Sequence, residues 1–153
     1  MSAVLRPEPW IQPLAGRDLE AVVAIEREIY EFPWTVGNFR DSLAAGYSCW
    51  GYHSADGLIG YAVMMIGSDE AHLLNLSIAA PVQRRGYGRL LLEHLVKVAR
   101  GHGARLMLLE VRPTNHAARR LYGAYGFEQV GVRRGYYPAR EGREDALLLT
   151  YAL

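Results

Sequence analysis

Glu110 is the side chain of this sequence best placed to act as a proton acceptor. It follows the apolar run Leu106–Leu109, and a carboxylate at the end of such a run is costly to bury unless it is solvated, paired or used. Such a carboxylate could take a proton from an amine, directly or through a water, as a general base does. The alternative is a structural role, in which Glu110 reaches solvent or pairs with Arg112.

Tyr122 is the matching candidate for a proton donor. It lies seven residues after Asn115, which on a helix is two turns, so both side chains share one face, with Arg119 between them on the same side. A tyrosine hydroxyl, with an ordinary pKa of about 10, is protonated at neutral pH and could protonate a departing thiolate. Asn115 is expected to cap the helix, and core packing beside Leu121 is the alternative for Tyr122.

The segment Ile78–Gly88 has the composition of an anion-binding loop. It is expected to follow a strand and to open a helix, whose N-terminus offers unpaired N–H groups and a positive dipole end. Gly86 and Gly88 would let a phosphate approach the backbone closely. Positive charge is added by Arg84, Arg85 and Arg89. The alternative is an ordinary helix start with solvated arginines, because neither G-x-G-x-x-G nor G-K-[ST] is present.

These residues need strands and helices to position them, and the hydrophobic periodicity supplies both. Helices are expected at Asp18–Tyr30, Thr35–Leu43, Gly88–Gly101 and Asn115–Tyr125. Strands are expected at Trp10–Pro13, Tyr47–His53, Leu58–Ile66, Glu70–Ile78, Leu106–Val111, Gln129–Tyr137 and Asp145–Ala152. The nearly continuous apolar run Leu106–Val111 predicts a central strand that is buried on both faces. This order predicts an α/β protein with a mixed sheet and helices on both of its faces.

Length and composition bound the remaining possibilities. The 153 residues fit one domain spanning 1–153, and 50% hydrophobic with 22% charged residues is an ordinary globular balance. A formal net charge of +1 disfavours direct nucleic-acid binding. Met1–Trp10 lacks the apolar core of a secretory signal, and no apolar run approaches the ~20 residues that span a bilayer. With Cys49 as the single cysteine, the expectation is a cytoplasmic protein without membrane contact.

Two motifs resemble those of the GNAT superfamily of N-acetyltransferases. Gln83–Gly88 matches its Q/R-x-x-G-x-G/A signature, and Asn115–Phe127 is similar to its N-x-x-A-x-x-L-Y-x-x-x-G-F motif. The resemblance implies about seven mostly antiparallel strands with a parallel central pair, four helices, and acetyl-CoA as co-substrate without a metal. It implies that acetyl-CoA is bound by Leu76, Ser77, Ile78, Arg84, Arg85, Gly86, Tyr87, Gly88, Arg89 and Asn115.

Further stretches resemble the bacterial members of the family that acetylate the N-terminal alanine of a small-subunit ribosomal protein. Leu108–Asn115 is similar to their L-E-V-R-x-x-N, and Arg133–Ala146 to their R-x-Y-Y-P…G-R-E-D-A ending. The resemblance implies Glu110 as the base and Tyr122 as the acid. It places the substrate peptide between Phe32, Pro33 and Trp34 on one side and Tyr136 and Tyr137 on the other.

Gly135 stands where asparagine is common in these relatives, a difference that bears on peptide preference and not on the chemistry.

Other functions stay open at this point. An acetyltransferase for polyamines or aminoglycosides would favour an acidic rim, which Glu26, Glu28 and Glu31 could form. A module that binds acetyl-CoA without catalysis is another alternative. Cys49 could in principle form an acetyl-enzyme, but a buried strand cysteine is the expected role. The five histidines show no paired spacing typical of a metal site.

Overall fold

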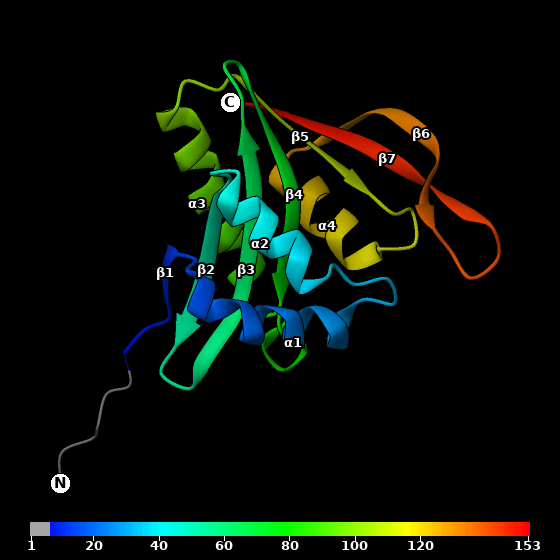
Figure 1. The fold of residues 1–153 in the computed structure, drawn as a ribbon. Coiled ribbons are helices and arrows are strands. Elements are labelled where there is room, and N and C mark those ends of the chain that lie inside the picture. The colour runs from blue at the N-terminus through cyan, green and yellow to red at the C-terminus, as the bar shows by residue number, and fades with distance from the viewer. Residues whose placement is uncertain (1–6) are drawn as a thin grey trace, which may run out of the picture.

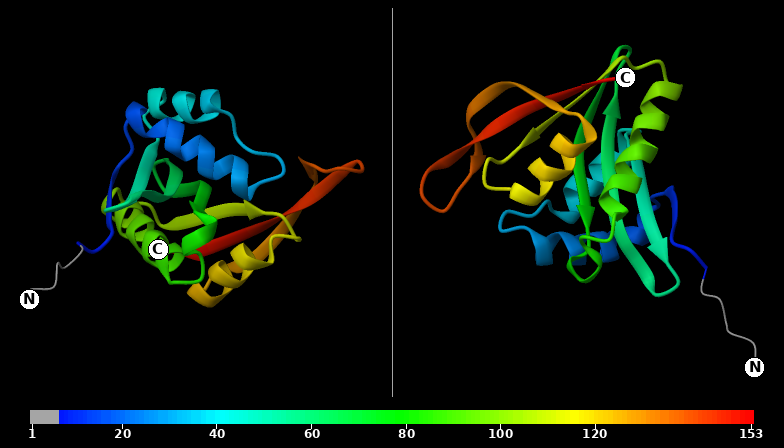
Figure 2. Two further views of the ribbon diagram at one scale, coloured as in Figure 1. Left: turned by 90° about the horizontal axis from the view of Figure 1, so that it is seen from below. Right: turned by 180° about the vertical axis from the view of Figure 1, so that it is seen from behind.

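The computed structural model describes residues 7–153 as a seven-stranded sheet with helices on both faces (Figures 1 and 2). The elements are β1 (Trp10–Pro13), α1 (Leu19–Ile29), α2 (Val36–Ala44), β2 (Ser48–Ser54), β3 (Gly57–Ile66), β4 (Glu70–Ile78), α3 (Tyr87–Gly101), β5 (Leu106–Val111), α4 (His116–Tyr125), β6 (Glu128–Pro138) and β7 (Arg143–Ala152), with short 3-10 helices at Gly16–Asp18 and Ala80–Val82.

The strand order is β1-β2-β3-β4-β5-β7-β6, with β4 and β5 parallel and the other neighbours antiparallel. The expected mixed sheet with a parallel central pair and four α-helices is therefore confirmed. Each expected strand and helix exists, and most of their boundaries agree within one or two residues. The two 3-10 helices were not expected, because a single turn carries too little periodicity to detect.

Helix ends follow the capping signals of the sequence. Thr35 caps α2, where its Oγ1 accepts a hydrogen bond from the Asn38 N–H at 3.1 Å. Asn115 caps α4, where its Oδ1 accepts from the Ala118 N–H at 3.2 Å. Gly126, at φ 120°, ends that helix in a conformation that favours glycine. The expected capping role of Asn115 is confirmed, and it fixes the start of the helix that carries Tyr122.

Each face of the sheet buries its own apolar cluster, as the left view of Figure 2 indicates by the helices on opposite sides. On one face, α3 contributes Leu91, Leu92 and Leu95, which have no exposed surface. On the other face, Val22 of α1 and Phe39 of α2 are buried. The sheet is therefore held from both sides along β2, β3 and β4, which places its central strands rigidly.

The expectation that β5 is buried on both faces is wrong. Met107, Leu109 and Val111 are buried, but the alternate residues of the strand are only half-buried. The helices α1 and α2 pack on β3 and β2, so they leave the same face of β5 partly open. Glu110 points to this open face, because its neighbours in the strand, Leu109 and Val111, point to the other.

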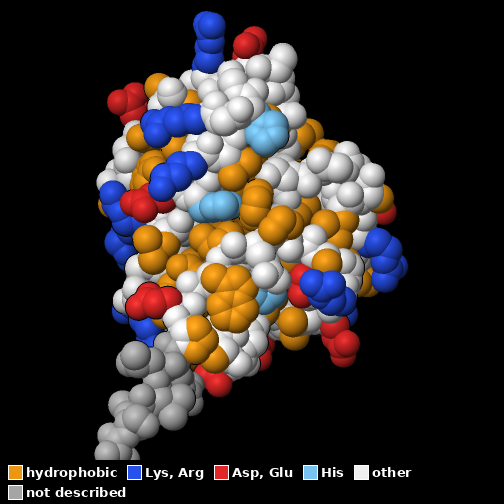
Figure 3. Space-filling view, turned by 90° about the vertical axis from the view of Figure 1, so that its left-hand side faces the viewer, with side chains coloured by type: hydrophobic (Ala, Val, Ile, Leu, Met, Phe, Trp, Pro, Cys, Tyr) orange, Lys and Arg blue, Asp and Glu red, His pale blue; other side chains and the backbone are white. Residues whose placement is uncertain are grey.

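Aromatic and imidazole rings gather at the β1 edge of the sheet. Trp10 stacks on His53 with ring centroids 5.8 Å apart, and Trp50 meets His94 edge-on at 4.3 Å. These pairs belong to β1, β2 and α3, whose side of the molecule shows hydrophobic and histidine side chains in Figure 3. The edge strand β1 has only four residues, and such shortness protects a sheet edge from further pairing.

Residues 1–6 lie outside the described residues, and the expectation on the Met1–Trp10 segment falls largely there. Within 7–153 no helix is long and apolar enough to cross a bilayer.

Gly60 packs so closely against β4 that replacing it with alanine should destabilise the fold. A Cβ at this position would lie 2.8 Å from the Ser77 carbonyl oxygen, and such overpacking costs about 1–3 kcal/mol. Gly101→Ala is the matched control, since nothing lies within 4 Å of its Cβ position and alanine favours the helix. Urea unfolding should show a lower midpoint for Gly60→Ala only; equal midpoints would contradict the close packing.

Candidate active site

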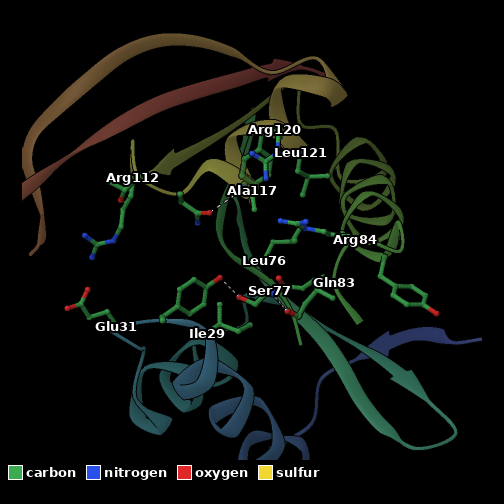
Figure 4. A pocket seen from close by; sticks show the side chains of 18 of the residues that line it. Ile29, Glu31, Leu76, Ser77, Gln83, Arg84, Arg112, Ala117, Arg120 and Leu121 are labelled. Carbon is green, nitrogen blue, oxygen red and sulfur yellow. Dashed lines mark hydrogen bonds between the residues drawn. The ribbon is translucent and has the colours of Figure 1, made fainter. Parts of the chain in front are cut away.

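A cavity of about 1180 Å³ opens where the two parallel strands separate. β4 and β5 are paired only where Glu70–His72 faces Leu106–Leu108, and beyond these residues their facing edges diverge. Figure 4 shows side chains that line this cavity, with Leu76 and Ser77 between Arg84 on one side and Glu31 and Arg112 on the other. The cavity therefore joins the loop before α3 to the ends of α1, β5 and α4.

The loop between β4 and α3 has a defined and partly strained shape. Gln83 donates from its side-chain amide to the Ile78 carbonyl at 2.8 Å, which ties the loop to the end of β4. Arg84 has φ 64° and Gly86 has φ 88°, and for a non-glycine residue this region costs ~1 kcal/mol or more. Strained backbone of this kind is concentrated at ligand-binding positions.

The structure brings most of the predicted residues together at this cavity. Every expected acetyl-CoA contact except Arg85 lines it, and so do Tyr122 and Phe32. Arg120 and Arg112 also line it, although the sequence did not single them out. Arg119 was expected on the helix face of Asn115 and Tyr122. Its guanidinium donates a hydrogen bond to the Pro113 carbonyl oxygen at 3.0 Å, and Arg119 does not line the cavity.

Arginines and apolar side chains both line the cavity. Arg84, Arg89 and Arg120 provide positive charge around the α3 and α4 N-termini, while Leu76 and Leu121 are apolar. Figure 4 shows Arg84, Arg120 and Leu121 on the same side of the cavity. Such a mixed lining suits a ligand that has both anionic and less polar parts.

Glu110 lies beside the cavity and not among its lining residues. Its Oε2 lies 2.6 Å from Nε2 of His72 on β4, and its side chain is only 6% exposed. Arg133 approaches Oε1 at 3.5 Å without a hydrogen bond, so this buried oxygen has no hydrogen-bond partner among the described residues. Burying a carboxylate oxygen without a hydrogen-bond partner costs free energy of folding. Neither alternative for Glu110 holds, because it is not solvated and because Arg112 pairs with Glu144.

Tyr122 is buried to 6% exposure and lines the cavity. Burial, with smaller contributions from Tyr30 and Tyr137, raises the pKa of its hydroxyl well above the ordinary value. The pKa of Tyr137 is raised in the same way, first by burial and then by the charge of Glu110. These effects place Tyr122, Tyr137 and Glu110 in one electrostatic neighbourhood, in which both hydroxyls stay protonated at neutral pH.

Arg112 joins the two sides of the expected acceptor site. Its guanidinium lies 4.3 Å from the ring centroid of Tyr137 and 5.3 Å from that of Phe32. It also donates to the Pro138 carbonyl at 2.8 Å and to Glu144 at 3.0 Å. Nearby, Glu31 and Arg140 form an ion pair between the α1–α2 loop and the β6–β7 loop. Two segments distant in sequence are thus held together over the cavity.

The other predicted acceptor residues lie apart from the cavity lining. The Trp34 ring packs against Phe39 with centroids 5.1 Å apart and belongs to the core beneath α2. Tyr136 is 42% exposed and meets Tyr137 edge-on. Pro33 is exposed on the α1–α2 loop. Of the five predicted acceptor residues, Phe32 lines the cavity and Tyr137 does not, but Arg112 contacts the rings of both.

Glu26 has a different role from the acidic rim that the sequence allowed. Its side chain is only 2% exposed. Oε1 accepts hydrogen bonds from the Tyr61 hydroxyl at 2.7 Å and from the Asn75 amide at 3.0 Å, while Oε2 accepts from the Trp34 N–H at 2.9 Å. Glu26 is therefore no part of a rim, Glu31 is paired to Arg140, and of the three glutamates Glu28 remains exposed on α1 outside the cavity lining.

The Cys49 side chain is buried, and burial raises the pKa of its thiol to about 11. It therefore stays a thiol at neutral pH, and the expectation of a buried strand cysteine is confirmed. Within 7–153 no group of three or more His, Cys, Asp or Glu side chains could hold a metal ion.

Comparison with known proteins relates this site to a family. Residues 19–127 match the profile of the Acetyltransferase (GNAT) family. The [ribosomal protein bS18]-alanine N-acetyltransferase of Salmonella typhimurium is 37% identical over 139 residues, which cover 91% of this chain and 94% of that protein. The Escherichia coli (strain K12) protein of the same name is 36% identical over the same length.

Solved structures agree with this relationship. The ribosomal-protein-S18-alanine N-acetyltransferase of Escherichia coli superposes with a TM-score of 0.87 at 34% identity, covering 95% of this chain and 94% of that one. Arabidopsis thaliana NAA60, solved in complex with acetyl-CoA, superposes with a TM-score of 0.86 over 95% of this chain and 99% of that one. At 22% sequence identity, this superposition shows a shared fold and no more.

Glu144 should stabilise the segment between β5 and α4 in a pH-dependent way. Partial burial alone would raise its pKa, but hydrogen bonds from Thr114 and Arg112, with the Arg112 charge, lower it overall. A carboxyl with a lowered folded-state pKa stabilises the fold above its unfolded pKa of about 4.3, and the contribution is lost as pH falls through the folded value.

Glu144→Gln should therefore cost on the order of 1 kcal/mol near pH 7, and the deficit relative to wild type should shrink toward about pH 3. Urea unfolding of both proteins across this range measures it. A deficit that stays constant with pH would show that the carboxylate charge is not responsible.

Proposed function

The chain belongs to the Acetyltransferase (GNAT) family, and we propose that it transfers the acetyl group of acetyl-CoA to the N-terminal α-amine of a protein. The proposed acceptor is the N-terminal alanine of ribosomal protein bS18. The observation that carries this proposal is 37% identity over 91% of the chain to a [ribosomal protein bS18]-alanine N-acetyltransferase. A cavity lined by Tyr122 and by nine of the ten expected acetyl-CoA contacts supports it.

The cavity fits acetyl-CoA in both shape and chemistry. The parted strands leave room along β4, and the glycine loop at the start of α3 can receive a pyrophosphate. Arg84, Arg89 and Arg120 supply charge for the phosphates, while Leu76 and Leu121 suit the less polar arm. Bound acetyl-CoA supplies an activated acetyl thioester, and backbone N–H groups of Leu76–Ile78 could polarise its carbonyl.

Glu110 and Tyr122 supply the two proton transfers. A new bond forms between the amine nitrogen and the acetyl carbon as the carbon–sulfur bond breaks. The amine gives up a proton that Glu110 accepts, directly or through a water, and the sulfur receives one from Tyr122. His72 holds Oε2 of Glu110, which leaves Oε1 as the oxygen available for the proton. The raised pKa of Tyr122 keeps its proton in place until the thiolate forms.

The acceptor side favours a peptide over a polycation. Phe32 and Tyr137 lie on either side of the Arg112 guanidinium, and the carboxylates of Glu26 and Glu31 are already engaged. A polyamine or aminoglycoside would meet little free negative charge there. The proposal treats 1–153 as one catalytic domain that acts in the cytoplasm on a ribosomal protein, without direct contact to nucleic acid or membrane.

Mass spectrometry of a peptide library incubated with acetyl-CoA tests the proposed function. We expect acetylation at the α-amine, with alanine-initiated peptides modified fastest and spermidine a poor competitor. Preferred acetylation of spermidine would favour the small-molecule alternative. Absence of CoA release with every amine tested would favour an acetyl-CoA-binding module without catalysis.

Glu110→Gln should lower kcat/KM for an alanine-initiated peptide by about 100-fold or more, because the amide cannot accept the proton. The rate is measured between about pH 6 and 9, around the ordinary α-amino pKa of about 8, together with the Kd for acetyl-CoA, which should change little. Glu128→Gln, an exposed glutamate at the start of β6, is the control. Wild-type rates for Glu110→Gln across this range would exclude Glu110 as the base.

A further inference from the structure

We propose that the phenol oxygen of Tyr30 is the hydrogen-bond acceptor that holds and orients the attacking α-amine. We further propose that the buried carboxylate of Glu26 sets the direction of a chain of hydrogen bonds, and that this direction makes the Tyr30 oxygen an acceptor. This inference rests on the proposed function, since it concerns how the same site receives its peptide. It adds a substrate-orienting residue to the two proton-transfer residues, Glu110 and Tyr122.

The direction of the hydrogen-bond chain starts at Glu26. A carboxylate can only accept hydrogen bonds, and Oε1 of Glu26 lies 3.0 Å from the Asn75 amide nitrogen. Asn75 must therefore point its NH₂ group to Glu26, which leaves its carbonyl oxygen facing Ser77. Both Asn75 and Ser77 are buried, at 9% and 3% exposure, so their choice of partners is narrow.

The chain then runs outward to Tyr30 in a fixed order. The Ser77 hydroxyl donates to the Asn75 carbonyl oxygen at 2.7 Å, which uses its single proton. The Tyr30 hydroxyl lies 2.6 Å from the same Ser77 oxygen. Because Ser77 has no proton left for this contact, Tyr30 must be the donor. Each hydrogen bond in such a chain strengthens the next.

Tyr30 consequently offers only lone pairs to the cavity that it lines. Its proton is committed to Ser77, so it cannot donate to the acetyl carbonyl or to the departing sulfur. Burial, opposed by the Ser77 hydrogen bond and assisted by Glu26, raises the pKa of Tyr30 to about 12. The phenol is therefore neutral at physiological pH and keeps its proton in the chain.

A hydrogen-bond acceptor at this place matches the chemistry of an amine. A protonated or neutral α-amine brings two or three N–H donors, whereas the acetylated product keeps one, so the contact favours substrate over product. Tyr30 ends α1 two residues before Phe32, which lines the same cavity and flanks Arg112. Tyr30 thus lines the cavity close in sequence to Phe32, and we propose that the peptide lies between Phe32 and Tyr137.

Glu26 also holds the backbone of the α1–α2 loop. Its second oxygen accepts from the Trp34 N–H at 2.9 Å, so one buried carboxylate holds both the α1–α2 loop and the β4 residues behind Tyr30. The acceptor loop and the strand beside the acetyl site are therefore positioned together.

Tyr30→Phe tests the inference with little change in shape. We expect kcat/KM for an alanine-initiated peptide to fall about tenfold, as for loss of one hydrogen bond to a polar donor, with most of the change in KM. The Kd for acetyl-CoA, measured by calorimetry, should stay within about twofold of wild type, since no contact to it is assigned to Tyr30. Ser77→Ala removes the acceptor of the Tyr30 proton, frees the hydroxyl to rotate, and should give a smaller fall of about threefold.

Tyr47→Phe is the matched control, because Tyr47 packs against the core cluster that contains Val22 and Phe39 and is not among the residues that line the cavity. Its kcat/KM should equal that of wild type. An unchanged KM and kcat for Tyr30→Phe would overturn the inference, and so would a loss of acetyl-CoA affinity as large as the loss in kcat/KM. If the wild-type protein acetylates no peptide, both the proposed function and this inference are overturned. If the wild type is active and Tyr30→Phe is equally active, this inference alone is overturned.

Discussion

The separation of β4 from β5 is the constraint on which the rest of the molecule depends. Two parallel strands normally share a full ladder, but here Glu70–His72 and Leu106–Leu108 are the only paired stretch. Each strand keeps its outer neighbour, β3 for β4 and β7 for β5, over most of its length. The sheet therefore does not unravel where the central edges part. The opening leaves backbone groups and side chains of two buried strands facing a ligand-sized cavity, which is costly in a folded core unless a ligand uses them.

Two buried glutamates near this opening differ in how far their oxygens are satisfied by hydrogen bonds. Glu26 receives three hydrogen bonds, from Tyr61, Asn75 and the Trp34 backbone, so both its oxygens are satisfied. Glu110 has His72 at one oxygen and no hydrogen-bond partner at the other within the described residues. The two carboxylates are both buried, but their hydrogen bonding differs. The first carboxylate orders its surroundings, and the second retains an oxygen that can take a proton.

The sequence was sufficient for the elements and for most residues that line the cavity near the loop before α3, because both depend on local signals. Periodicity located every strand and α-helix, and caps such as Thr35 and Asn115 act within one turn of the chain. The burial of β5 was misjudged, since periodicity does not tell which helices cover a strand. The Glu26–Asn75 hydrogen bond spans 49 residues, and the Arg112–Glu144 bond spans 32. No local pattern reports such contacts, so the sequence left Glu26 open as a member of an acidic rim and did not predict the roles of Tyr30, His72 and Arg120.

Two buried tyrosines facing one cavity illustrate why pKa alone does not assign a role. Burial raises the pKa of both Tyr30 and Tyr122, so both hydroxyls are protonated at neutral pH. They differ in where the proton points. The Tyr30 proton is held by Ser77 at the end of a chain that starts at a carboxylate, whereas no hydrogen bond within residues 7–153 engages the Tyr122 hydroxyl. In the proposed reaction, the committed proton makes the Tyr30 oxygen an acceptor for the incoming amine, and the uncommitted proton leaves the Tyr122 hydroxyl able to donate to the leaving sulfur. The direction of these hydrogen bonds is set by Glu26 acting through Asn75, which lies 49 residues from it in sequence, and it separates two side chains that are chemically the same.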